Sequence, residues 1–135
     1  MIVSFKVYGK PQGKARPRFT KSGRVYTPNK TKEYENSIRK AYISAAGTMK
    51  ATSFVTDKAV KITIQACYKK PKSSRRDYPT VKPDLDNVVK AVLDGLNGAA
   101  FMDDKQVVSI EARKKYAIPS WEEPHIEVWV RTLDE

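Results

Sequence analysis

The chain has 135 residues, of which 40% are hydrophobic and 30% charged, the composition of a soluble globular domain with room for a real core. Its 26 Lys and Arg residues exceed its 15 Asp and Glu residues by 11, which favours a polyanionic partner, nucleic acid first and an anionic membrane second. It shows no membrane span, signal-peptide core, basic amphipathic insertion helix or cysteine pair, so we expect one cytoplasmic domain over residues 1–135 that binds nucleic acid and no membrane.

Residues 2–8 alternate apolar and polar side chains, which predicts a β-strand with its apolar residues on one face. The next segment, 9–27, is rich in Gly and Pro, so we expect no regular structure there. Nine Lys and Arg residues precede Glu33, the first acidic residue. We interpret 9–27 as an exposed basic arm that contacts DNA, the alternative being a solvated loop with incidental charge. The candidate DNA contacts in this arm are Lys14, Arg16 and Arg18, with Phe19 and Tyr26 as stacking partners for bases.

The segment from about 29 to 49 repeats apolar residues at helical spacing and is predicted to form an amphipathic helix. Thr27 can cap this helix, and Pro28 suits its first position. Residues 51–57 are expected to form a loop. Residues 60–68 then alternate apolar and polar side chains, the clearest strand pattern in the chain.

A second basic segment, 69–82, carries six Lys and Arg residues among turn formers and leads directly into a predicted helix. Apolar residues of that helix recur at i, i+3, i+4 and i+7 along 85–96, which indicates one buried stripe. Pro83 and Asp84 suit the helix start, and Gly95, Asn97 and Gly98 are expected to end it. The candidate DNA contacts of the basic segment are Lys72, Arg75, Arg76 and Lys82.

Two further strands are predicted, at 106–116 and around 126–130, joined by a turn at 118–124. Because they are close in sequence, we expect them to pair as an antiparallel hairpin. The element order is therefore β-α-β-α-β-β. It predicts an α/β (α+β) fold with a single mixed sheet of about four strands and two amphipathic helices packed on it.

Four carboxylates flank the predicted helix 85–96. Asp84 and Asp86 stand at its start, and Asp103 and Asp104 follow in the next loop. Each pair alone has an ordinary interpretation, as helix caps or as a turn. If the fold brings the pairs together, their mutual repulsion must be relieved by a cation or by protonation. Oxygen ligands without Cys or His favour Mg²⁺ or Mn²⁺ over Zn²⁺.

Three further residues have chemical potential. Lys90 lies one helical turn after Asp86, where it can form an ion pair or neutralise charge that develops on a phosphate, and the spacing leaves both open. His125 is the only histidine; since one histidine cannot build a zinc site, we interpret it as a surface residue. Cys67 is interpreted as a small strand residue. No Gly-rich phosphate loop follows a strand, so nucleotide hydrolysis has no support.

The pattern Asp84-Leu85-Asp86-Asn87-x-x-Lys90, followed by an apolar-rich stretch and Asp103-Asp104-x-Gln106-Val107, resembles the signature of the RusA family of Holliday junction resolvases. These are small bacterial and prophage endonucleases that act on four-way DNA junctions. The similarity extends to the basic segment 14–19, to 26–28 and to the helix 28–42, so it covers nearly the whole chain. The aspartate pattern is its specific part, and the basic loops at 9–27 and 69–82 are less specific.

The resemblance implies that Asp84, Asp86 and Asp104 are the metal-binding catalytic acids, with Asp103 as an accessory acid and Lys90 as the catalytic lysine. It also implies a homodimer that needs Mg²⁺ or Mn²⁺ and places paired nicks across a junction in DNA recombination and repair. Some family members have an arginine-rich run that abuts the first acid. Here 82–83 intervenes after Arg75-Arg76, so which basic residues grip the junction stays open.

We therefore expect a divalent-metal-dependent endodeoxyribonuclease that resolves branched DNA without a nucleotide cofactor. Two alternatives remain. A metal-dependent nuclease for another DNA structure would use the same acids. A non-catalytic basic DNA-binding module would leave the acids as caps and turns.

Overall fold

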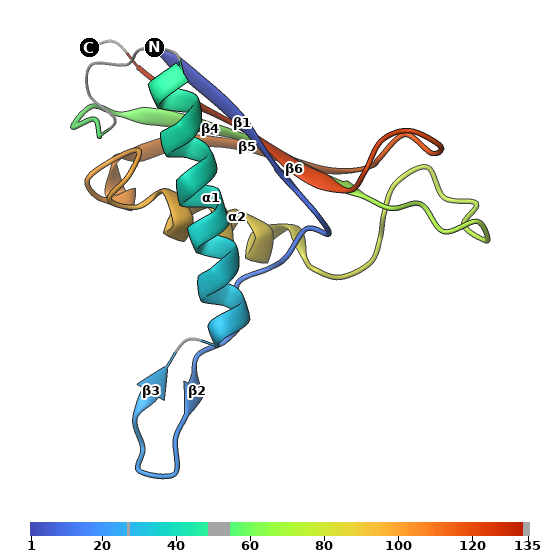
Figure 1. Cartoon of the computed structure of the whole chain (residues 1–135), viewed down its shortest axis with the longest axis horizontal. Helices are drawn as coiled ribbons and strands as arrows, with labels where there is room; N and C mark the ends of the chain where they lie inside the picture. The colour runs from blue at the N-terminus through green and yellow to red at the C-terminus, as the bar shows by residue number, and fades with distance from the viewer. Residues whose placement is uncertain (27, 49–54, 134–135) are drawn as a thin grey trace.

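The computed structural model describes residues 1–26, 28–48 and 55–133, so the predicted cap Thr27 and most of the predicted loop 51–57 lie outside the described residues. The main elements are β1 (Ile2–Tyr8), α1 (Asn29–Thr48), β4 (Val60–Tyr68), α2 (Leu85–Leu96), β5 (Val107–Tyr116) and β6 (His125–Thr132) (Figure 1). The short elements are β2 (Arg18–Phe19), β3 (Val25–Tyr26) and the 3-10 helix η1 (Asp104–Gln106). The mixed sheet with two helices in the order β-α-β-α-β-β is thus confirmed. No described helix has the length and apolarity needed to span a bilayer.

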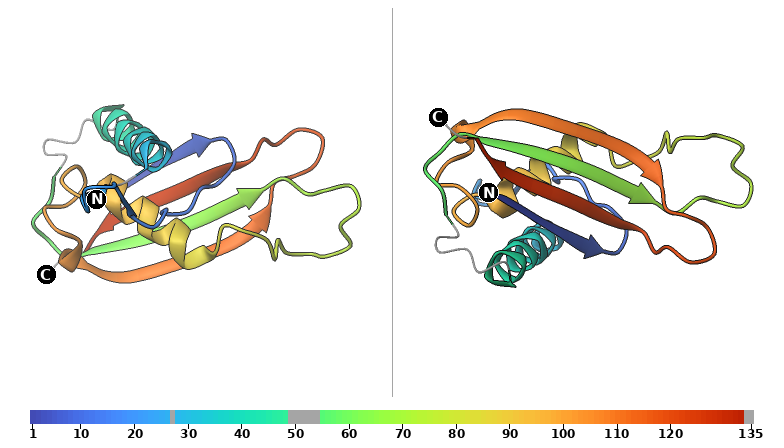
Figure 2. Two further views of the ribbon diagram at one scale, coloured as in Figure 1. Left: turned by 90° about the horizontal axis from the view of Figure 1, so that it is seen from below. Right: turned by 90° about the horizontal axis from the view of Figure 1, so that it is seen from above.

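The four-stranded sheet has the order β1-β6-β4-β5, with β4 and β5 parallel and β6 antiparallel to both of its neighbours (Figure 2). The predicted β5–β6 hairpin is therefore wrong, because β4 lies between the two strands. The connection 117–124 only has to cross about 10 Å, twice the spacing of adjacent strands, to pass the end of β4. This order places β4, which has no exposed residue, in the interior of the sheet, where a neighbour covers each edge.

Both helices lie on one face of the sheet, and the core fills the space between (Figure 2). Gly95 does not end α2 as expected but lies inside it, where an added Cβ would stand 2.9 Å from Cβ of Ile38 on α1. The missing side chain lets the helices approach closely. The helix ends at Leu96, with Asn97 as its C-cap and Gly98 at a φ of +81°. The core side chains come mainly from both helices and from β1, β4 and β6: α1 (Tyr34, Ile38, Tyr42, Ala46), α2 (Val88, Ala91, Val92, Leu96), β1 (Val3, Phe5, Val7), β4 (Val60, Ile62, Ile64, Ala66, Tyr68) and β6 (Ile126, Val128, Val130).

The basic arm is not irregular throughout, because β2 and β3 pair as a small hairpin that projects from the body (Figure 1). Backbone hydrogen bonds between Thr20 and Arg24 (2.8 Å) and between Gly23 and Thr20 (2.9 Å) close its turn. Gly23 adopts a φ of +84°, which glycine tolerates without strain. The hairpin leaves Phe19 70% and Tyr26 42% exposed, so both aromatic rings face solvent as the stacking hypothesis requires.

Candidate active site at the start of helix α2

The first turn of α2 carries two carboxylates that the protein itself does not use. Asp84 occupies the N-cap position, but its side chain makes no capping hydrogen bond, and its backbone carbonyl accepts the amides of Asn87 and Val88, each at 3.1 Å. Asp84, Asp86 and Lys90 are all exposed. Among the described residues, the side chains of these three make neither hydrogen bonds nor ion pairs, so the Asp86–Lys90 pair allowed by the spacing does not form. Unpaired charges of both signs therefore stand together at one helix end.

A segment of the basic arm lies over these charges and closes them into a pocket. The pocket has a volume of about 420 Å³ and is lined by Lys14, Ala15, Arg16, Pro17, Asp84, Asp86, Asn87 and Lys90. An adjacent pocket of about 490 Å³ shares Asp84 and adds Arg18 and Lys82. Two of the predicted acids, the predicted lysine and four predicted DNA contacts thus meet at the start of α2.

The arm is fastened to α2 at Gly13 and Lys14. The backbone amide of Lys14 donates to the carbonyl of Asn87 at 2.9 Å. At Gly13 an added Cβ would lie 2.9 Å from Cβ of Asn87 and 3.0 Å from Cβ of Pro83, so only glycine allows this approach. The position of the pocket wall therefore depends on a backbone contact that no helical or strand periodicity reveals.

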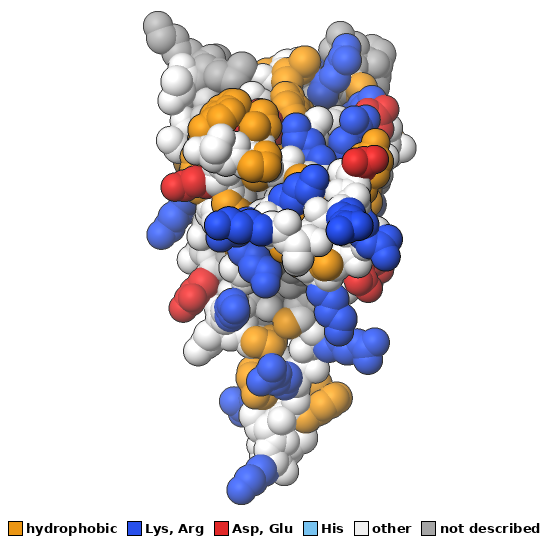
Figure 3. Space-filling model, turned by 90° about the vertical axis from the view of Figure 1, so that its right-hand side faces the viewer, with side chains coloured by type: hydrophobic (Ala, Val, Ile, Leu, Met, Phe, Trp, Pro, Cys, Tyr) orange, Lys and Arg blue, Asp and Glu red, His pale blue; other side chains and the backbone are white. Residues whose placement is uncertain are grey.

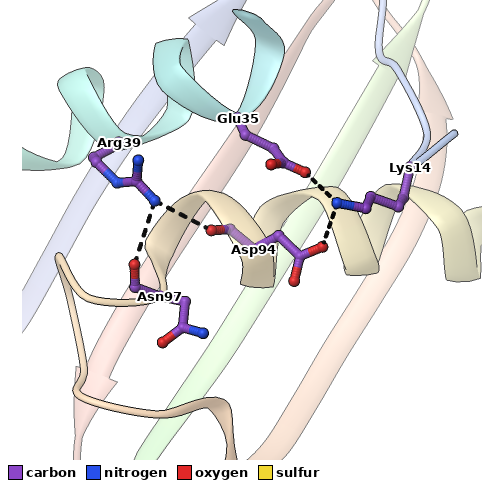
Figure 4. A network of polar contacts seen from close by, with 5 residues as sticks. All are labelled: Lys14, Glu35, Arg39, Asp94 and Asn97. Carbon is purple, nitrogen blue, oxygen red and sulfur yellow. Dashed lines mark hydrogen bonds and ion pairs between the residues drawn. The ribbon is translucent and has the colours of Figure 1, made fainter. Parts of the chain in front are cut away.

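The side chain of Lys14 is an internal clamp. Its Nζ lies 2.8 Å from a carboxylate oxygen of Glu35 on α1 and 2.9 Å from one of Asp94 on α2 (Figure 4). Burial disfavours the charged ammonium, but these two hydrogen-bonded carboxylates outweigh burial and raise the pKa of Lys14. Arg39 adds a second link, since its Nη2 donates to the carbonyls of Asp94 (3.5 Å) and Asn97 (3.3 Å) at the end of α2 (Figure 4). Lys14 thus joins the arm to both helices.

Tyr68, at the end of β4, holds the chain as it enters α2. Its buried hydroxyl donates to the carbonyl of Pro83 at 3.0 Å, directly before Asp84. Burial, followed by the influence of Tyr34 and Asp84, raises the pKa of Tyr68 to about 12. Sequence reasoning missed the roles of Tyr68, Gly13 and the Lys14 clamp. Each is a contact between distant segments and leaves no local signal.

The second pair of acids has a structural arrangement of its own. Oδ1 of Asp103 accepts the amide of Lys105 at 2.9 Å and caps η1, while Oε1 of Gln106 accepts the amide of Asp103 at 2.9 Å. The backbone hydrogen bond from Lys105, and then a hydrogen bond with Asp104, lower the pKa of Asp103. Nε2 of Gln106 donates to the carbonyls of Thr56 and Lys58, each at 2.9 Å. Asp103 therefore stabilises this turn by capping η1, one of the two interpretations that the sequence left open. The neighbouring Asp104 is exposed to solvent.

Within one chain, the two acid pairs lie at opposite ends of α2. The 12 residues of this helix span about 18 Å. The hydrogen bond from Tyr68 to Pro83 places Asp84 near the end of β4. Asp104 instead lies three residues before Val107, which pairs with Val60 at the beginning of β4. Both views show the start of α2 and the loop that follows it at opposite ends of the sheet (Figures 1 and 2). A single chain thus brings together Asp84, Asp86 and Lys90 but not Asp104.

The family model described as Endodeoxyribonuclease RusA matches residues 8–131, which include both acid pairs and both basic loops. The chain belongs to the RusA endodeoxyribonuclease family. It is also similar to the Bacillus subtilis (strain 168) protein named Uncharacterized protein YqaN, with 31% identity over 146 residues, 97% of this chain and 96% of the relative. The resemblance seen in the aspartate pattern is therefore confirmed.

Most of the predicted DNA contacts are exposed and therefore accessible to a partner. Lys and Arg side chains dominate the face that includes the projecting hairpin, and few acidic side chains interrupt them (Figure 3). Lys14 differs, because its charge is already paired inside the protein. The predicted contacts that are exposed are Arg16, Arg18, Lys72, Arg75, Arg76 and Lys82.

Proposed function

We propose that this chain is a Holliday junction resolvase, a divalent-metal-dependent endonuclease that works as a homodimer and makes paired nicks in four-way DNA junctions. One observation carries the proposal. Asp84, Asp86 and Lys90 are unpaired at the start of α2 and share a pocket with Arg16 of the basic arm. Membership of the RusA endodeoxyribonuclease family supports the same conclusion.

The residues present fit a hard divalent cation, Mg²⁺ or Mn²⁺. The Asp84 carboxylate stands at an N-cap without capping the helix, and Asp86 lines the same pocket, so both offer free oxygen ligands. When bound, the cation would supply an activated water and charge stabilisation at the phosphate. Lys90 would place its ammonium against the charge that develops on the phosphate oxygens, and Arg16 would bind an adjacent phosphate.

The third predicted acid, Asp104, would come from the second subunit. About 18 Å of helix separates the two acid pairs in one chain. If α2 of a second copy lies antiparallel to α2 across a two-fold axis, the loop that follows one helix reaches the start of the other. Each site would then combine Asp84 and Asp86 of one chain with Asp104 of the other, with Asp103 as the accessory acid.

An apolar surface beside α2 can receive this second copy. β5 is an edge strand, and on the helix-covered side of the sheet its Val108 is 62% and its Ile110 43% exposed. Met102, in the loop after α2, is 67% exposed, and Val89 and Leu93 of α2 are only partly buried. An apolar surface of this kind next to a functional site is typical of an interface. Two-fold symmetry of the protein matches a junction in which two strands must be cut symmetrically.

The DNA would contact the exposed Lys and Arg residues of the two basic loops, with the projecting hairpin offering Phe19 and Tyr26 for stacking on unpaired bases. Lys14 is left out of this set because of its two internal ion pairs. The proposed phosphate contacts are therefore Arg16, Arg18, Lys72, Arg75, Arg76 and Lys82.

A subunit-mixing experiment tests this arrangement. Asp86→Asn and Asp104→Asn are each expected to abolish cleavage of a four-way junction in Mg²⁺ while retaining junction binding. If each site is shared, a heterodimer of the two variants contains one site with both substitutions and one intact site. In an equal, fully re-equilibrated mixture about half of the dimers are heterodimers, so single nicks should appear with about a quarter of the wild-type number of active sites. Recovery of no activity, with heterodimers shown to form, would refute the shared site.

Substrate choice separates the proposal from its alternatives. Comparing a four-way junction, a flap and a linear duplex at equal salt should show preferential cleavage of the junction, dependent on Mg²⁺ or Mn²⁺ and blocked by EDTA. Equal or faster cleavage of the flap or duplex would favour a nuclease with another substrate. Tight binding without cleavage under any metal would favour a non-catalytic DNA-binding module.

A further inference from the structure

A second cluster of potential metal ligands lies outside the candidate nuclease site. Cys67 near the end of β4 and His125 at the start of β6 are directly opposite each other in the antiparallel pairing. Glu122 joins them from the connection between β5 and β6. The sulfur, one imidazole nitrogen and one carboxylate oxygen of these residues all lie within 4.8 Å of one another. Sequence reasoning treated Cys67 and His125 separately, whereas the fold brings them into one cluster.

The cluster is buried, which corrects the interpretation of His125 as a surface residue. His125 is 3% and Cys67 1% exposed, and Glu122 is half-buried. Cys67 and Tyr68 are neighbours in one strand, so their side chains point to opposite faces of the sheet. The cluster therefore lies on the face opposite the helices and shares no ligand with the acids at the start of α2.

The hydrogen bonds around the cluster leave ligand atoms free and oriented. Nδ1 of His125 lies 2.8 Å from the carbonyl oxygen of Glu123. A carbonyl only accepts, so Nδ1 must carry the hydrogen, and a neutral ring then has its lone pair on Nε2. A histidine that donates through one nitrogen to a carbonyl while the other binds a metal is the usual second-sphere arrangement. Oε1 of Glu122 accepts the amide of Ile118 at 3.1 Å, which leaves Oε2 available.

We propose that Cys67, His125 and Glu122 form a binding site for a borderline-soft divalent transition metal, with Zn²⁺ as its ion. A thiolate, an imidazole and a carboxylate are ligands that zinc accepts, whereas Mg²⁺ does not select sulfur. In a tetrahedral zinc site, ligand atoms are about 3.3 to 3.7 Å apart, and a cluster whose ligand atoms lie within 4.8 Å of one another is close to that spacing. A water molecule supplies the fourth ligand.

The surroundings favour a structural ion over a reactive cysteine. With 1% exposure, the Cys67 thiol is closed to any substrate. A metal that displaces the thiol proton would instead tie the connection 117–124 to the ends of β4 and β6. The neighbouring Tyr68 holds the entry to α2, so the ion would rigidify the strand end that positions Asp84.

Cobalt provides a direct test, because the chain has one cysteine and one histidine. The full-length protein, stripped with a chelator and kept in excess Mg²⁺ to saturate carboxylate sites, is titrated with Co²⁺. One equivalent should give visible d–d bands and a thiolate-to-cobalt charge-transfer band, both abolished by stoichiometric Zn²⁺. Cys67→Ala should remove the charge-transfer band and weaken Zn²⁺ affinity by more than about 100-fold. Glu122→Gln, on the exposed connection, should keep that band but weaken binding about 10-fold or more.

Two controls make the result decisive. At a Zn²⁺ concentration 100 times the wild-type Kd, the Tm of the wild type should rise by on the order of 10 °C, and that of Cys67→Ala by no more than about 1 °C. Asp86→Asn should bind cobalt like the wild type, because the two sites share no residue, and nuclease activity does not enter the readout. The absence of a charge-transfer band in folded wild type, or zinc stabilisation that persists in Cys67→Ala, would overturn the proposal.

Discussion

The Lys14 clamp leads to a prediction that separates a structural role from a DNA contact. In Lys14→Gln, the carboxylates of Glu35 and Asp94 lose their common partner. The side chain of Glu35 is 16% exposed and that of Asp94 40%, so solvent partly screens both charges. The loss of stability is therefore smaller than for a fully buried ion pair. Loss of hydrogen bonds to charged groups should lower the free energy of unfolding by about 1 to 3 kcal/mol. At about 2.1 cal/mol/K of unfolding entropy per residue, the 135-residue chain should lose about 4 to 10 °C in Tm.

Whether Lys14 contacts DNA is measured by the salt dependence of junction binding. Each phosphate contact adds about 0.9 to the magnitude of the slope of log K against log salt concentration. Lys14→Gln should leave this slope unchanged and slow cleavage, because the pocket wall is less firmly held. The matched control Arg18→Gln, an exposed residue of the same arm, should lower the slope by about 0.9 per chain without changing Tm. A Lys14→Gln variant with unchanged Tm and a slope reduced as in Arg18→Gln would refute the clamp.

Three further predictions follow from single contacts. Gly95→Ala should destabilise the protein by about 1 to 2 kcal/mol in chemical denaturation, because the added Cβ would meet Ile38. The control Gly47→Ala, with open space around it in α1, should stabilise the protein by up to about 1 kcal/mol. Equal effects of the two substitutions on the free energy of unfolding would contradict the close helix crossing. Tyr68→Phe should lower the free energy of unfolding by about 1 kcal/mol, because the carbonyl of Pro83 loses its hydrogen-bond donor. It should also slow cleavage without weakening junction binding. A wild-type cleavage rate in this variant would contradict the positioning role of Tyr68. The folded state raises the pKa of Tyr68 from 10.0 to about 12, so its contribution to stability is present below pH 10 and lost as pH rises toward 12. Alkaline unfolding should thus be steeper in the wild type than in Tyr68→Phe, and identical profiles would count against the buried hydroxyl.

Much of the fold follows from local patterns. Alternation along 60–68 and the apolar stripe along 85–96 predict β4 and α2 with nearly correct bounds, because burial on one face imposes a period on the sequence. The position of β6 does not follow. Which strands become neighbours depends on long-range packing and hydrogen bonding across the whole sheet. The short connection between β5 and β6 suggested that they pair, but each of them pairs with β4 instead.

The candidate site was predictable as residue types but not as an assembly. The aspartate pattern identifies Asp84, Asp86 and Lys90, and the structure places them around one pocket. Spacing carries no information on where the loop after a helix ends in space, so the separation of Asp104 by the length of α2 could not be foreseen. The pairing of Cys67 with His125 is likewise a matter of strand register between distant segments.

The most direct measurement is cleavage of a mobile four-way junction by the wild type and by Asp86→Asn, each with Mg²⁺ and with EDTA, resolved on a denaturing gel. We expect symmetric paired nicks from the wild type in Mg²⁺ only, and none from Asp86→Asn, which should bind the junction at least as tightly because a negative charge beside the phosphate is removed. Two results would contradict the assignment of the active site to the start of α2. One is cleavage by Asp86→Asn at the wild-type rate, and the other is a wild-type protein that binds the junction but does not cut it in Mg²⁺ or Mn²⁺.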